Sequence, residues 1–205
     1  TEINTASGIS ALDYYYQWAN VDKIVPVGAG EIDHKTAINL LATEQAGCVF
    51  SGPHTIASAV HQNPELKGKF AAVMMPTLEK GQTSVTSAQV NGVSISATCK
   101  DKELAADYIK FLTNAENFKA YNDATYRVPP TRSLQNSTAG DPNFEGFSEA
   151  LENYYIIENV TYMSDVQAIL AEALNACASG ANTDPADAAK TAEEKINKII
   201  DKNTK

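Results

Sequence analysis

The sequence predicts an α/β fold. Three short apolar runs, residues 46–50, 69–75 and 90–98, have the length and the bounding turn residues of strands. Around them, roughly seven or eight stretches repeat apolar residues at helical spacing. With 205 residues, the chain has room for one large domain or two small ones, and it is long enough to bury a core.

Composition narrows the classes of partner. Hydrophobic residues make up 43% of the chain and charged residues 20%, which is typical of a globular protein. The net charge is −9 and no basic cluster offsets it, so we expect no nucleic-acid partner. No apolar run approaches the roughly 20 residues that span a bilayer, and a leader peptide, if the protein is exported, lies outside this chain. The three cysteines have no CxxC spacing, which favours packing over a zinc site or a disulfide frame.

The turn after residues 46–50 is the most informative stretch. Helical spacing predicts helices over residues 8–19 and 34–43, and the run between residues 46 and 50 is typical of a buried parallel strand. It ends at Ser51 and Gly52, and Pro53 fits the first position of a new helix. Ligands of open α/β sheets bind where a strand ends and a helix begins. We therefore expect His54 on the rim of a site.

The second half is predicted to be mainly helical. Residues 101–112 and 115–123 form two helices, and two prolines after Val128 prevent continuation. A shorter helical piece runs to about residue 153. Ser164 and Gln167 form a capping box that opens the best-patterned helix, and Asp184 with Pro185 opens the last one.

The motifs do not require an enzyme. The chain lacks a Gly-x-Ser-x-Gly elbow, a His-Glu-x-x-His pair and a phosphate loop. His54 and His61 are about 10 Å apart along one helix, too far to share an ion, and we predict no metal and no cofactor. Two alternatives remain. One is a glycoside hydrolase using two acids among Glu31, Asp33 and Glu44, and the other is a helical protein-interaction module.

A binding site is better supported by the residue types. Polar side chains stand at turn–helix junctions, where Gln167 either caps its helix or contacts a ligand. Aromatic residues gather in the loops near Tyr126, Tyr154 and Tyr162. Aromatic faces combined with planar polar groups are how proteins hold sugars. A neutral, hydroxyl-rich ligand follows from this combination.

Several segments in order resemble one family. Residues 51–54, Ser-Gly-Pro-His, are similar to a strand that ends in Asn-Gly-Pro-Trp, and residues 74–76 to one that ends in Leu-Pro. Residues 100–106 and 111–117 match the next strand–helix and turn segments. The chain thus resembles the extracellular solute-binding proteins of ABC importers, in the carbohydrate group typified by maltose-binding protein.

The resemblance implies a periplasmic-binding-protein-like (type II) fold of which this chain is an incomplete C-terminal lobe. Residues 1–88 and 139–205 would form that lobe. Residues 89–138 would be a hinge strand and helices that pack on a missing N-terminal lobe, possibly held as a separate fragment. The implied function is to bind a sugar or small oligosaccharide between the lobes and deliver it to ABC permease subunits. The implied location is extracytoplasmic, in the periplasm or on a lipid anchor.

The resemblance also implies the ligand-binding residues. His54 takes the place of a tryptophan that stacks on sugar, and His34 that of another aromatic residue. Gln167 stands where the family has an aromatic residue in the penultimate helix. Further candidates are Ser51, Asn91, Arg127 and Tyr162. Because the aromatic platform is incomplete, we expect a smaller or more polar sugar than a long glucan.

Overall fold

The computed structural model describes residues 2–89 and 91–204, and these are mostly helical. The chain divides into two compact units. The first comprises Thr1–Asp33 and Glu158–Lys205, and the second His34–Ile157. No helix in the described part of the chain is long and apolar enough to cross a membrane.

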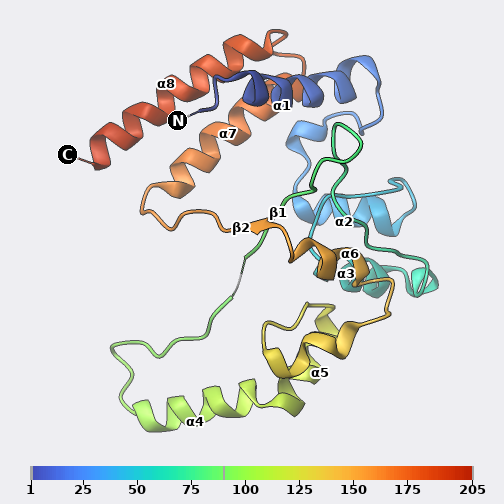
Figure 1. Cartoon of the computed structure of the whole chain (residues 1–205), viewed down its shortest axis with the longest axis vertical. Helices are drawn as coiled ribbons and strands as arrows, with labels where there is room; N and C mark the ends of the chain where they lie inside the picture. Colours follow the sequence, from blue (N-terminus) through green and yellow to red (C-terminus); the bar gives the residue numbers. More distant parts are fainter. Residues whose placement is uncertain (1, 90, 205) are drawn as a thin grey trace. The chain divides into compact units, whose positions relative to one another are not determined.

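The first unit is built on three helices that lie side by side (Figure 1). They are α1 (Ala6–Tyr16), α7 (Met163–Ala178) and α8 (Pro185–Asn203), and a π-helical turn, Gln17–Val21, extends α1. A 3-10 turn, Ala29–Glu31, packs on α7. Their buried core is rich in small side chains, which let helix axes approach closely: Leu12, Ala173, Cys177, Ala188, Ala189 and Ala192.

The helix starts in this unit agree with the sequence in one case and differ in another. Asp184 caps α8, because its carboxylate accepts hydrogen bonds from the backbone N–H groups of Ala186 and Asp187. The capping box predicted at Ser164 is wrong. The N-cap of α7 is Tyr162, two residues before Ser164, and no side chain caps the helix. Ser164 consequently lies inside the first turn, exposed to solvent.

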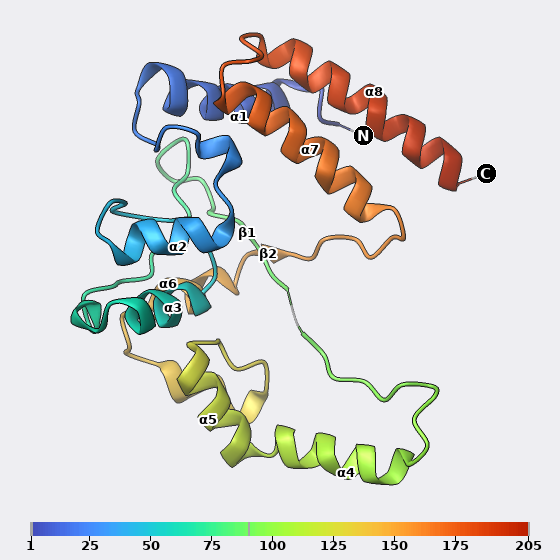
Figure 2. The same cartoon turned by 180° about the vertical axis from the view of Figure 1, so that it is seen from behind.

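The second unit contains the remaining helices. In it α2 (His34–Ala42) and α3 (His54–Gln62) lie against each other, as Figure 2 shows. Ile38, Leu41, Ala42 and Ala59 form their shared core. Short 3-10 segments cover Pro64–Leu66 and Arg132–Thr138, and α6 spans Glu145–Ala150.

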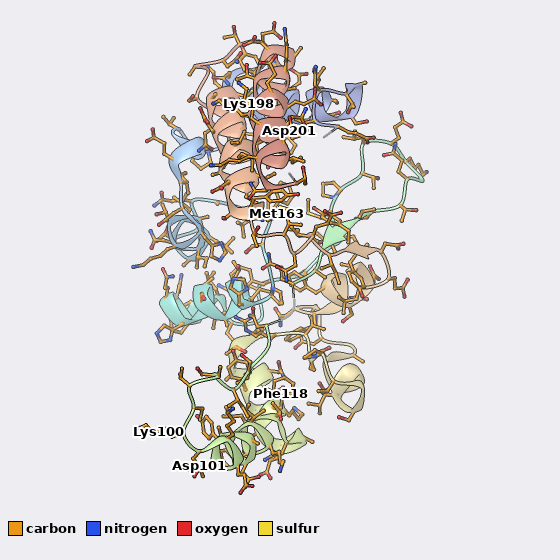
Figure 3. All side chains as sticks on the ribbon, turned by 90° about the vertical axis from the view of Figure 1, so that its left-hand side faces the viewer. Lys100, Asp101, Phe118, Met163, Lys198 and Asp201 are labelled. Carbon is orange, nitrogen blue, oxygen red and sulfur yellow. The ribbon has the colours of Figure 1, made fainter. Side chains whose placement is uncertain are left out.

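The pair α4 (Lys102–Thr113) and α5 (Ala115–Thr125) completes this unit. Asp101, labelled in Figure 3, caps α4 by accepting a hydrogen bond from the N–H of Leu104. The predicted helices are confirmed here. However, α4 contains no buried residue, and its apolar side chains are largely exposed, Leu104 to 67% and Phe111 to 60%.

The predicted sheet is not present in the described residues. No strand forms over residues 46–50, 69–75 or 91–98, and residue 90 lies outside the described part. Among the described residues, a single parallel ladder pairs β1 (Thr86–Ser87) with β2 (Tyr154–Tyr155). The predicted α/β fold is therefore confirmed in its helices and wrong in its strands.

The physical reason is the lack of partner strands, since an extended segment becomes a strand only by pairing. Cys48 and Phe50, expected to be buried, are exposed. The segment around Ala72 bonds through its backbone to the turn before α6 and to the start of that helix. The Ala72 N–H donates to the Pro142 carbonyl, and the Gly146 N–H donates to the Ala72 carbonyl. Gly146 is needed at that contact, because a Cβ there would lie 2.6 Å from the Ala72 backbone.

Candidate functional site

Two histidines meet where α2 and α3 begin. His34 is the first residue of α2 and His54 the first of α3. Their Nε2 atoms are 3.0 Å apart, and their ring centroids are separated by 5.1 Å. One Nε2 must donate and the other accept in such a contact, so at least one imidazole is neutral. The two residues, 20 positions apart, form one polar group.

The turn before α3 holds His54 in place. Pro53 is the N-cap, so the helix starts one residue later than predicted. Thr55 is buried, and its hydroxyl lies 2.7 Å from the Ser51 hydroxyl, to which it donates a hydrogen bond. The His54 ring lies against Gly52, because a Cβ at Gly52 would be 3.0 Å from His54 Nδ1. A side chain at position 52 would therefore displace the imidazole.

Arg127 reaches the same site from the end of α5, which packs against α3. Tyr126 takes a left-handed conformation (φ 51°) and ends the helix, and its ring stacks on the buried Phe144 with centroids 5.8 Å apart. The Arg127 N–H then donates to the Asn122 carbonyl. Arg127 Nε is buried and has no hydrogen-bond partner among the described residues.

These surroundings disfavour a charged His54. Burial, the neighbouring His34 and the positive charge of Arg127 together lower the pKa of His54 below its usual 6.5. At neutral pH the site therefore presents a neutral imidazole beside a fixed guanidinium charge. Among residues 2–89 and 91–204, no three His, Cys, Asp or Glu side chains cluster as metal ligands.

The predicted site residues divide between the two units. Ser51, His34, His54 and Arg127 gather in the second unit. Asn91 also belongs to it but lies exposed in an irregular segment, with no hydrogen bond to the histidines. Two further candidates belong to the first unit: Tyr162, half-buried before α7, and Gln167, exposed on that helix.

Sequence reasoning missed the residues that support the site. Thr55 is one of them, and its spacing of four from Ser51 is the signal that could have identified it. The sequence predicts that Tyr126 is available to a sugar, whereas its ring stacks on Phe144 and its backbone positions Arg127. A left-handed aromatic residue at a helix end leaves no local sequence signature.

Comparisons of the sequence with known proteins find binding proteins in each case. The sequence profile of the family described as bacterial extracellular solute-binding protein matches residues 4–146. A galactooligosaccharide-binding protein of Bacillus subtilis (strain 168) is 27% identical over 133 residues, which cover 64% of this chain and 30% of the relative.

A similar solved structure is that of a cyclo/maltodextrin-binding protein complexed with maltotetraose. It matches with a TM-score of 0.73 at 19% identity, over 97% of this chain and 49% of that one. The likeness establishes the fold, as the sequence resemblance implied. The chain spans about half the length of that protein, and the matched segment covers 30% of the curated relative. Because the family profile covers more than half of the chain and all the residues of the histidine site, this chain belongs to the bacterial extracellular solute-binding protein family.

Proposed function

We propose that the protein is the carbohydrate-binding component of an ABC importer. The observation that carries the proposal is the pairing of His34 with His54 at the start of α3, within the region that the family profile covers. The similar proteins are named for binding galactooligosaccharides and maltodextrins, and such proteins bind without covalent chemistry.

The ligand site in this proposal is polar. His34, His54 and Ser51 offer both donors and acceptors to sugar hydroxyls, because a neutral imidazole has one nitrogen of each kind and a hydroxyl can do both. Arg127 adds donors only. Asn91, Tyr162 and Gln167 remain further candidates for contact with the ligand. A site of this composition suits a short, polar sugar better than a long glucan, whose apolar faces need aromatic platforms.

We further propose that the chain supplies the C-terminal lobe of a two-lobed protein. Residues 1–88 and 139–205 belong to that lobe, and residues 89–138 pack on an N-terminal lobe, whether continuous or a separate fragment. The exposed apolar face of α4, with Leu104 and Phe111, supports this arrangement. Sugar binding closes the lobes by hinge bending. The closed form docks on the permease outside the cytoplasm, in the periplasm or on a lipid anchor.

The test uses the intact protein, including any sequence that flanks residues 1–205. Thermal-shift measurements against mono- and disaccharides identify the ligand, and small-angle scattering measures closure. We expect a raised melting temperature and a smaller radius of gyration with at least one sugar. His54→Ala should abolish both effects, whereas His61→Ala, a change on the exposed far end of α3, should not. Turnover of a glycoside, or no response to any sugar, would contradict the proposal.

A further inference from the structure

The side chain of Arg127 lacks an acceptor. Its Nε is buried without a partner, and it forms no side-chain hydrogen bond or ion pair with the residues that the structure describes. A buried donor on a charged group that is left unpaired costs more free energy than a neutral one. Native structures rarely retain such a group without a use for it. The unmet donor therefore points to a group that arrives from outside the chain.

No salt bridge among the described residues neutralises Arg127. The helices α2 and α3 contain no acidic residue. On α5, Asp123 is engaged with Lys119 at 2.6 Å, and Glu116 lies at the opposite end of the helix from Arg127. The charges that act on His54 are those of His34 and Arg127, and both are positive when present. Although the whole chain carries −9, neither α2 nor α3 supplies an acid to the site.

At neutral pH the site has one fixed positive charge, which matches a ligand with a single negative group. His34 and His54 share a hydrogen bond and His54 resists protonation, so the fixed charge is the one on Arg127. A planar guanidinium pairs with a carboxylate through two parallel N–H donors. The imidazole N–H and the first turns of α2 and α3 favour the same sign of ligand charge.

We propose that the ligand is an acidic sugar whose carboxylate binds between the Arg127 guanidinium and the paired imidazoles of His34 and His54. This inference rests on the proposed carbohydrate-binding function, and it replaces the neutral ligand expected from the sequence with a uronic-acid sugar. The relatives named above are described as binders of galactooligosaccharides and maltodextrins, so the proposal distinguishes this chain from them.

The experiment is calorimetric titration of the intact protein with matched pairs: galactose and galacturonate, glucose and glucuronate, galactobiose and digalacturonate. Glucose 6-phosphate and acetate serve as a phosphate sugar and a free carboxylate. We expect at least one uronate to bind tenfold or more tightly than its neutral partner at low salt. That ratio should shrink between about 20 and 500 mM salt, because the contact is partly exposed.

Variants test whether Arg127 causes the preference for uronates over neutral sugars. Arg127→Gln should reduce the uronate-to-neutral ratio of affinities to near one. Arg127→Lys keeps the positive charge but loses the two parallel N–H donors of the guanidinium, and it should leave an intermediate ratio. Lys198→Gln, on α8 and labelled in Figure 3, changes the net charge equally and should keep the full ratio. If Arg127→Gln does not fold, the lysine variant and the salt series carry the test.

The outcomes separate the two proposals. Equal binding of neutral and acidic partners would overturn the acidic-sugar inference and leave the carbohydrate-binding function standing. Binding of glucose 6-phosphate without any uronate, or of acetate as tightly as the uronates, would also overturn it. No binding of any sugar would overturn both.

Discussion

Helices α8 and α4 carry similar apolar stripes but differ in what covers them. On α8 the stripe is buried, with Ile196 fully enclosed and Ala192 2% exposed. On α4 the corresponding side chains face solvent, Leu104 to 67% and Tyr108 to 60%. Both segments are capped by an aspartate and both form the helices that their periodicity predicts. Periodicity therefore predicts that a helix has an apolar face, but not which partner covers it.

The largest expected effect is at Ile196. Replacing it with alanine removes most of a fully buried side chain and leaves a cavity between α8 and its neighbours. We expect a loss of about 2–5 kcal/mol in the free energy of unfolding, measured by urea denaturation of the intact protein. A loss under about 0.5 kcal/mol, which is typical of surface positions, would show that the first unit is not packed as described.

Leu104→Ala on α4 sharpens the comparison, because its effect depends on the proposed N-terminal lobe. If that lobe covers α4 in the intact protein, the substitution should cost about 2 kcal/mol or more, as at a buried site. Lys102→Ala, at the exposed start of the same helix, is the control and should cost little. A Leu104 effect as small as that of Lys102 would contradict the lobe-packing proposal.

A smaller effect separates the two capping predictions. Asp184→Ala removes the side chain that accepts two backbone N–H groups at the start of α8, and it should cost about 1 kcal/mol. Ser164→Ala should change stability by less than about 0.5 kcal/mol, since Ser164 caps nothing. Equal losses from both substitutions would mean that the capping box at Ser164 forms after all.

The smallest effect concerns pH. The pKa of His54 is lowered in the folded protein, so the unfolded chain binds a proton at this residue more readily. The contribution to stability is fully present above pH 6.5, the ordinary value, and is lost as pH falls through the lowered folded pKa. Unfolding free energies of the wild type and His54→Asn, compared from pH 8 to 5, should converge toward acid pH. A constant difference would contradict this account.

Ligand binding should shift the pKa of His54 in the opposite direction. A carboxylate beside His54 stabilises its protonated form and so raises its pKa in the complex. Binding of a uronate should then take up protons and strengthen as pH falls through the ordinary range of histidine, although free His54 resists protonation. Proton uptake is measured by calorimetry in buffers of different ionisation enthalpy.

Local chemistry accounts for what could be predicted. Asp101 and Asp184 mark helix starts because capping involves residues that are neighbours in sequence. The strands could not be predicted, because whether residues 46–50 become a strand depends on a partner that no local pattern identifies. Ser164 shows the same limit on a smaller scale: its motif is present in the sequence, but the N-cap of α7 lies two residues earlier, at Tyr162.

The candidate site, too, could be predicted from the sequence only in part. The glycine–proline turn placed His54 at a helix start, and the family resemblance drew attention to His34 and Arg127. Their meeting depends on packing between α2, α3 and α5, and the unpartnered Nε of Arg127 depends on burial that no motif encodes. Nonlocal contacts therefore decide the chemistry of the site, while local sequence decides where its elements begin.

The central claim is that the paired histidines form part of the sugar site, and imidazole resonances test it most directly. Nitrogen–proton spectra of the intact protein, assigned with single histidine variants, are recorded during titration with a sugar that raises its melting temperature. The account predicts that the signals of His34 and His54 shift together and saturate with the binding curve, while that of His61 stays fixed. Saturation of binding with the His34 and His54 signals unmoved would contradict it.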